Sequence, residues 1–229
     1  MLFTLIAIDV ELASGSTPIS VGVATLNERA EYTSRLFSLP GIRLPTDESG
    51  EPVLQRSGQV RNCRVASHGD FSEHKWTKFW RHNGRMLALQ LDWDDAGGKD
   101  PDAVWIAIRE HIDYHAARAA ERRATVRVVA DNAGIDIGVI NENLKRIRPD
   151  DDTITLDHMV QNDGNRRHSF VVDARSPRWQ RQLGILRYQP WRLDGIKLAK
   201  HFAPHDALLS LCEYAGYIQA YPMVEWPKK

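Results

Sequence analysis

The first residues of the chain constrain its fold more than any other segment. Residues 2–9 form an apolar run that ends in the carboxylate of Asp9 and lacks the basic leader of a signal peptide. Such a run predicts a buried strand. Residues 18–26 predict a second strand after a turn-rich linker, and a third strand near 30–38 completes an antiparallel meander. The chain is therefore expected to begin as a β-sheet.

Helices and strands alternate further along the chain. Asp100 and Pro101 start a helix, because proline is favoured in the first turn and the apolar residues that follow recur every four positions. The order of the elements predicts an α/β fold, in which a mixed sheet of an antiparallel meander plus parallel strands is flanked by helices. The other expected elements are helices around 76–80, over 135–147 and over about 205–220, and strands over 126–130 and 153–156.

The length of 229 residues fits one domain that carries an insertion, or two small domains. No change in composition marks a linker, so we expect a single domain over 1–229. Residues 39–72 contain three prolines, four glycines and little periodicity, a length that is uncommon for a plain loop. We interpret them as a lid or a substrate-facing excursion.

The charge balance and the cysteines limit the possible partners and the cellular compartment. Lys plus Arg equal Asp plus Glu at 30 each, so a polyanionic partner has to be held by a local patch or by metal ions. Residues 164–200 hold nine basic and two acidic residues, either a solvated surface or a phosphate-tracking groove.

Cys63 and Cys212 lie far apart without zinc-ligand spacing, which predicts free thiols in the cytoplasm. No stretch reaches the roughly 18 apolar residues of a membrane helix.

Acidic residues follow the ends of predicted strands and the starts of predicted helices. Asp9 and Glu11 lie two positions apart on a strand, so their side chains share one face. Such a pair is either a solvated strand end or a cation site of the kind that binds Mg²⁺. Asp136 opens a helix, where an acid is also an ordinary cap. His201 precedes Asp206 across a proline break, and the two can share one site.

Together these segments resemble the motifs of the DEDDh exonucleases, a family of the RNase H-like superfamily that includes RNase T and oligoribonuclease. The family has Asp-x-Glu after its first strand, a His-Asn-Ala-x-Phe-Asp type segment after a later strand, and His-x-Ala-x-x-Asp-Ala near the C-terminus. The corresponding segments here are Asp9-Val10-Glu11, Asp131-Asn132-Ala133-Gly134-Ile135-Asp136 and His201-Phe202-Ala203-Pro204-His205-Asp206-Ala207. The length and the tryptophans near residue 76 look most like the compact RNase T-like 3′–5′ exoribonucleases, a group that also contains phage exonucleases.

The chain departs from the family's pattern at two places. Asp131 stands where the family has His, and Leu12-Ala13-Ser14 replaces a Thr-Thr-Gly type stretch that cradles the terminal sugar of the substrate. The choice between RNA and DNA stays open, because it depends on contacts to the 2′-OH that no motif reveals.

The resemblance implies an RNase H-like exonuclease fold and a metal-dependent 3′–5′ exonuclease. Such an enzyme releases nucleoside 5′-monophosphates from the 3′ end of single-stranded RNA or DNA by a two-metal-ion mechanism. The resemblance places two Mg²⁺ ions, or Mn²⁺, on Asp9, Glu11, Asp136 and Asp206. It makes His201 the general base that acts on the attacking water, and its spacing selects His201 over His205.

The resemblance also implies where the substrate binds. Leu12 and Ala13 correspond to the sugar-cradling stretch, and Asn132 belongs to the second motif. The resemblance lets one of Trp76, Phe79 and Trp80 stack on a terminal base, with Trp80 the expected ring, although aromatic residues at helical spacing are usually core. A nucleic-acid-binding module that keeps the fold without catalysis is the alternative. Enzymes of this group are often dimers, so a homodimer is an expected assembly.

Overall fold

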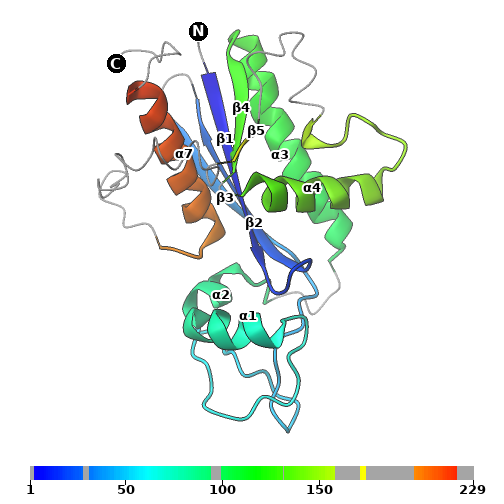
Figure 1. The fold of residues 1–229 in the computed structure, drawn as a ribbon. Coiled ribbons are helices and arrows are strands. Elements are labelled where there is room, and N and C mark those ends of the chain that lie inside the picture. Colours follow the sequence, from blue (N-terminus) through cyan, green and yellow to red (C-terminus); the bar gives the residue numbers. More distant parts are fainter. Residues whose placement is uncertain are drawn as a thin grey trace.

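The computed structural model describes residues 3–27, 31–93, 99–130, 132–157, 171–173 and 199–220. Their strands form one five-stranded sheet in the order β3-β2-β1-β4-β5 (Figure 1). The strands are β1 (Phe3–Leu12), β2 (Pro18–Leu26), β3 (Tyr32–Ser38), β4 (Thr125–Ala130) and β5 (Val171–Asp173). The helices are α1 (Glu73–Lys78), the 3₁₀ turn η1 (Trp80–His82), α2 (Gly84–Gln90), α3 (Pro101–Glu121), α4 (Ala133–Ile147) and α7 (Ala203–Ala220).

The sheet is mixed, as the sequence predicts. β1 pairs antiparallel with β2, and β2 pairs antiparallel with β3, which is the expected meander. β1 also pairs parallel with β4, and β4 pairs parallel with β5. The prediction of an α/β fold with a mixed sheet flanked by helices is therefore confirmed, and β1 is the central strand.

The strand expected at 153–156 is wrong. These residues form turns that lead into a helical stretch at 156–157, and the fifth strand is β5. Asp151 accepts hydrogen bonds from the backbone N and the hydroxyl of Thr153, at 2.9 and 2.6 Å. The guanidinium of Arg109 donates to the three carbonyl oxygens of residues 153–155. Successive carbonyls of a strand point in opposite directions, so three that converge on one side chain exclude a strand.

Two helices begin two residues earlier than expected. α4 starts at Ala133 rather than at 135, and α7 starts at Ala203 rather than at 205. Pro204 therefore lies in the first turn of α7, where its missing N–H has no helical partner to lose. The basic stretch 164–200 lies outside the described residues except for 171–173 and 199–200, and Asp131 lies outside them as well.

The two faces of the sheet are covered by different helices. Every second residue of β1 packs with α3 and α4 in the main core, namely Ile6, Ile8, Val10 and Leu12. The residues between them, which include Asp9 and Glu11, point to the other face, because side chains alternate along a strand. α7 lies along that face and contacts β1 and β2 (Figure 1). The two acids of β1 therefore face α7.

Residues 39–72, all of them described, contain no helix or strand, as the sequence predicts. Together with α1, η1 and α2 they form a lobe below the carboxyl end of β1 (Figure 1), and we call residues 39–93 the lower lobe. Its hydrophobic cluster includes Val53, Leu54, Phe71, Trp76, Trp80 and Leu87, joined by Ala13 and Ile19 from the β1–β2 hairpin. The lower lobe thus packs against the strand end that carries the acids. Its role as a lid stays a prediction.

Within the described part of the chain, no helix combines the length and the apolar character that crossing a membrane requires.

Candidate active site

Glu11 lies at the carboxyl end of β1 on the face that α7 covers. Its Cα is opposite Ser20 of β2, and that of Asp9 is opposite Gly22, so both acids have small residues beside them. The Glu11 side chain is buried, with 8% of the residue exposed. Small neighbours leave room above the strand for groups that come from α7.

Asp136 joins the start of α4 to the end of β1. Its Oδ2 accepts a hydrogen bond from the backbone N of Asn132 at 3.1 Å, and its Oδ1 accepts one from the backbone N of Val10 at 3.3 Å. The first contact resembles one half of a capping box, in which an acid of the first turn accepts a hydrogen bond from the backbone N of the N-cap residue. The second contact places this buried carboxylate beside the strand end, where its charge acts on Glu11.

Asp206 lies in the first turn of α7 and organises the residues before it. Its Oδ2 accepts a hydrogen bond from the backbone N of His201 at 2.8 Å. His201 has a positive φ of 63°, a left-handed conformation that is uncommon for a residue other than glycine. Its imidazole ring contacts the ring of Phe79 edge to face, with the centroids 4.5 Å apart. The break before α7 therefore turns His201 back toward the lower lobe.

These elements bring three of the five predicted catalytic residues into one group. Ligand atoms of Glu11, His201 and Asp206 all lie within 4.8 Å of one another. Asp9 and Asp136, which are also described, do not join this group. Asp136 instead directs its carboxylate to backbone amides, and Asp9 is the preceding acid on the same face of β1.

The electrostatics of the group show an excess of negative charge. Burial and, to a smaller extent, the charges of Asp206 and Asp136 raise the pKa of Glu11 from its ordinary 4.5 to about 7, against the lowering effect of Lys75. A divalent cation removes such an excess, and carboxylate oxygens are the ligands that suit Mg²⁺ or Mn²⁺. The carboxylates of Glu11 and Asp206 therefore fit one such cation.

His201 is electrostatically suited to accept a proton. Burial lowers its pKa, Asp206 opposes that shift, and Lys200 and Lys75 add to it. A lowered pKa keeps the imidazole neutral near pH 7, which leaves a ring nitrogen with a free electron pair.

His205, the alternative base, is engaged elsewhere. Its Nδ1 accepts a hydrogen bond from the backbone N of Ala199 at 2.9 Å, and its ring contacts Phe202 with centroids 4.8 Å apart. The geometry therefore favours His201, in agreement with the motif spacing.

The stacking role expected of Trp80 is wrong. Trp80 is fully buried in the core of the lower lobe, so its ring offers no face to a base. Its Nε1 donates to the carbonyl oxygen of Leu12 at 2.9 Å, and this bond ties the lobe to the end of β1. Leu12 and Ala13 also have buried side chains, so any contact they make to a sugar is through the backbone. Asn132 is half-buried at the start of α4.

Phe79, one of the three rings that the sequence offered for stacking, borders the site, and Lys75, which the sequence did not indicate, lies beside it. Phe79 is half-buried against His201, and the Nζ of Lys75 lies 4.8 Å from the centroid of its ring. Helical spacing separates the three rings. Trp76 and Trp80 are four residues apart and lie on one buried side, whereas Phe79 lies beside that side. The ring available at the site is thus Phe79.

Gly22 of β2 allows α7 to begin close to the sheet. A Cβ on Gly22 would lie 2.1 Å from the carbonyl C of Ala203 and 2.4 Å from the N of Pro204. Gly22→Ala is therefore expected to lower the free energy of unfolding by about 1–3 kcal/mol and to reduce metal binding, because the start of α7 has to shift. Chemical denaturation and Mn²⁺ titration measure both effects.

Gly138→Ala in α4 is the matched control for this substitution. A Cβ there meets nothing within 4 Å, so we expect unchanged or slightly higher stability. Wild-type stability and metal binding in Gly22→Ala would contradict the close approach of α7.

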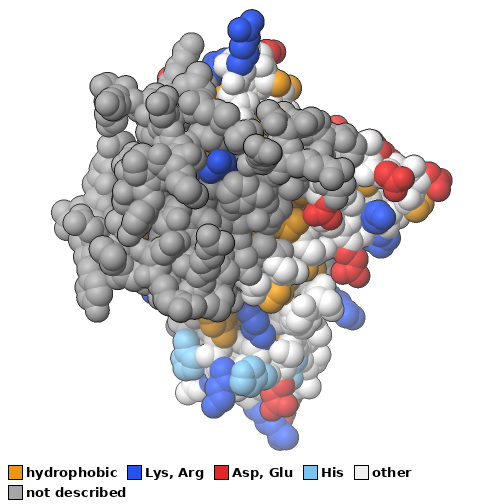
Figure 2. Space-filling model, turned by 45° about the horizontal axis from the view of Figure 1, so that its top comes forward, with side chains coloured by type: hydrophobic (Ala, Val, Ile, Leu, Met, Phe, Trp, Pro, Cys, Tyr) orange, Lys and Arg blue, Asp and Glu red, His pale blue; other side chains and the backbone are white. Residues whose placement is uncertain are grey.

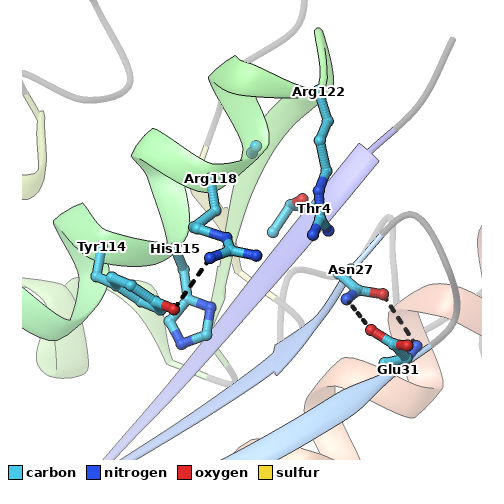
Figure 3. A pocket seen from close by; sticks show the side chains of 8 residues that line it. Thr4, Asn27, Glu31, Tyr114, His115, Arg118 and Arg122 are labelled. Atoms are coloured by element: carbon cyan, nitrogen blue, oxygen red, sulfur yellow. Dashed lines mark hydrogen bonds between the residues drawn. The ribbon is translucent and has the colours of Figure 1, made fainter.

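A polar hollow lies at the opposite end of β1 from the acids (Figure 3). It is lined by Thr4, Asn27, Glu31, Tyr114, His115, Arg118, Ala119 and Arg122. The Nη1 of Arg118 lies 3.5 Å from the hydroxyl of Tyr114, and the carboxylate of Glu31 accepts a hydrogen bond from Asn27. Arg118 is in the last turn of α3, where a cation offsets the helix dipole. This hollow is therefore separate from the acidic site.

Comparison of the chain with family models, with curated proteins and with solved structures finds no match in any of the three. The function therefore has to be inferred from the site itself and from the resemblance of its motifs.

Proposed function

We propose that this chain is a metal-dependent 3′–5′ exonuclease of the DEDDh type, with an RNase H-like fold, that acts on single-stranded RNA or DNA. One observation carries the proposal: Glu11 from the first strand and His201 and Asp206 from the start of the last helix meet within 4.8 Å. These are an acid of the first motif and the base and acid of the third. The mixed sheet, with its antiparallel meander and parallel strands, supports the same family.

The metal ions supply charge neutralisation at the reacting phosphate. Two Mg²⁺ or Mn²⁺ ions held by Asp9, Glu11, Asp136 and Asp206 would stabilise the attacking and leaving oxygens of an in-line displacement. Asp136 keeps the ends of β1 and α4 together, and Asp206 fixes the backbone of His201. The protein's own part is thus to hold carboxylates and base in one arrangement before substrate binds.

His201 is the proposed general base. Its imidazole nitrogen takes a proton from the attacking water as the water oxygen bonds to phosphorus. The bond from phosphorus to the 3′ oxygen breaks, and that oxygen takes up a proton from solvent and stays with the shortened strand. The product is a nucleoside 5′-monophosphate. The lowered pKa of His201 favours this role, since a base has to be unprotonated at the working pH.

The lower lobe supplies the proposed surface for the nucleic acid. Residues 73–90 contain Lys75, Lys78, Arg81 and Arg85 but a single acid, Glu73. Figure 2 shows Lys, Arg and His side chains together on this part of the molecule. Cations in this number attract a phosphate backbone, and Phe79 at the inner end of the surface can stack on the terminal base.

His201→Ala is expected to lower kcat by about 10²–10⁴-fold, the range for loss of a general base. Metal binding should stay near the wild-type value, because the carboxylates remain. Single-turnover cleavage and Mn²⁺ titration, each on wild type and variant, separate the two effects. Loss of metal binding with the same severity as loss of turnover would contradict the role as base.

A cleavage assay tests the proposal as a whole. Strands labelled at the 5′ end, of RNA and of DNA, are incubated with Mg²⁺ and then with EDTA, beside a dinucleotide. An exonuclease gives a ladder of shortened products that EDTA abolishes. Binding of the strands without a ladder would instead support the non-catalytic binding module, and the RNA and DNA arms give the substrate preference that depends on contacts to the 2′-OH.

The compartment and the assembly are part of the proposal. A cytoplasmic setting fits the two widely separated cysteines, of which Cys63 is a free thiol. A homodimer is the proposed assembly, and sedimentation measures it.

A further inference from the structure

Gln90 ends α2 and is a fully buried polar side chain. Its Oε1 accepts hydrogen bonds from the hydroxyl of Ser20 at 2.9 Å and from the backbone N of Ala203 at 3.0 Å. Its Nε2 donates to the carbonyl oxygen of His201 at 2.8 Å and to that of Met86 at 3.2 Å. An amide has two donor hydrogens and two acceptor lone pairs, so every hydrogen-bonding capacity of Gln90 is used.

These four bonds join three parts of the chain. Met86 belongs to the same helix, Ser20 belongs to β2, and His201 and Ala203 precede and begin α7. Ser20 is also the residue opposite Glu11 in the β1–β2 register. Gln90 therefore links the backbone of His201 by hydrogen bonds to β2, which pairs with the strand that carries Glu11.

His201 needs such a support because of its backbone. Its φ of 63° is a conformation that residues with a Cβ rarely adopt, and it persists only where neighbours determine it. The N–H of His201 is held by Asp206, and its C=O is held by Gln90. Both polar groups of the residue's backbone are therefore fixed by side chains from different elements, the buried Gln90 of α2 and the half-buried Asp206 of α7.

We propose that Gln90 is a positioning residue of the catalytic centre, which holds His201 in the left-handed conformation that presents its imidazole to the acids. The proposal rests on the proposed nuclease function. It gives the lower lobe a structural part in catalysis that the sequence did not indicate.

Gln90→Met tests the proposal, because methionine keeps the volume and removes the hydrogen bonds. We expect kcat to fall by about 10–100-fold, the usual effect of removing a group that orients a catalytic residue. KM for the strand and affinity for Mn²⁺ should stay within about twofold, since the metal ligands are unchanged. Ser20→Ala is the matched control: it removes a bond to the same Oε1 but none to residues 201–203, and it should keep near-wild-type kcat.

A double substitution separates positioning from general destabilisation. If Gln90 acts through His201, Gln90→Met should cause little further loss of kcat in the His201→Ala background. An equal loss with and without His201 would overturn the proposal, and so would wild-type kcat in Gln90→Met. Gln90→Glu serves if the methionine variant does not fold, because it keeps the acceptor oxygen and removes the amide donor to His201. It should lower kcat at unchanged KM, and wild-type kcat in this variant would overturn the proposal as well.

Backbone amide exchange tests the same contact without any activity. Hydrogen exchange followed by NMR should be faster at the amides of Ala203 and His201 in Gln90→Met, and unchanged there in Ser20→Ala. Unchanged exchange in Gln90→Met would overturn the proposal. If the wild type cleaves no strand, the proposed function fails, whereas this measurement still decides whether Gln90 holds the His201 segment.

Discussion

Asp206→Asn is expected to lower metal-dependent cleavage by about 10³-fold or more, and to weaken Mn²⁺ binding at the same time. Asparagine keeps an oxygen that can accept the hydrogen bond now made by the backbone N of His201 at 2.8 Å. The substitution therefore removes the charge and leaves the connection to His201. Because the carboxylate is a proposed metal ligand, its loss should reduce metal binding as well as turnover, whereas loss of His201 should reduce turnover alone.

Single-turnover cleavage with Mg²⁺ and calorimetric titration with Mn²⁺ measure both parts. His205→Ala is the neighbouring control, because His205 bonds to Ala199 and contacts Phe202 instead of the acidic group. It should change turnover by only a few-fold. If His205→Ala were the inactive variant and Asp206→Asn kept wild-type turnover and metal affinity, the assignment of the third motif would be wrong.

Glu11→Gln is expected to inactivate the enzyme and yet to stabilise the metal-free protein. Burial raises the pKa of Glu11 from 4.5 to about 7, so the folded protein disfavours the charged carboxylate. Below pH 4.5 the group is protonated in both states and its charge has no cost. Between pH 4.5 and 7 folding takes up a proton, so stability falls as the pH rises, and above about pH 7 the full cost applies.

The size of this effect follows from the pKa difference. At pH 8 the metal-free wild type should be less stable than Glu11→Gln by about 3 kcal/mol at most, which is about 6–12 °C in Tm for a chain of this length. The difference should shrink toward pH 5, and Mg²⁺ should raise the Tm of the wild type but not that of the variant. Thermal unfolding at pH 5 and pH 8, with Mg²⁺ and with EDTA, measures all four states.

Two results would contradict the assignment of Glu11. One is a Glu11→Gln variant that is less stable than the wild type at pH 8 without metal. The other is a variant that keeps Mg²⁺-dependent cleavage, because the proposal makes the Glu11 carboxylate a metal ligand.

Local periodicity predicted what depends on neighbours in the sequence. The apolar run of residues 2–9 predicted β1, and the alternation of side chains along a strand placed Asp9 and Glu11 on one face. Asp136 and Asp206 were correctly placed at helix starts, because caps and proline act within one turn. Local signals failed at 153–156, where the β-branched residues favoured a strand but Arg109 holds three successive carbonyls.

The sequence by itself determined strands β1 to β4 and the residue types of the site, since strand and helix periodicity and capping are local properties. Only the tertiary structure decided which of these residues meet. Glu11 and Asp206 come together because Gly22 admits the start of α7 against the sheet, and His201 faces them because Gln90 and Asp206 hold its backbone. Trp80 is core and Phe79 borders the site because the lower lobe buries one ring against Leu12 and leaves the other beside His201. Contacts between residues this far apart in the chain depend on how helices and strands pack together. A local sequence pattern therefore cannot predict them.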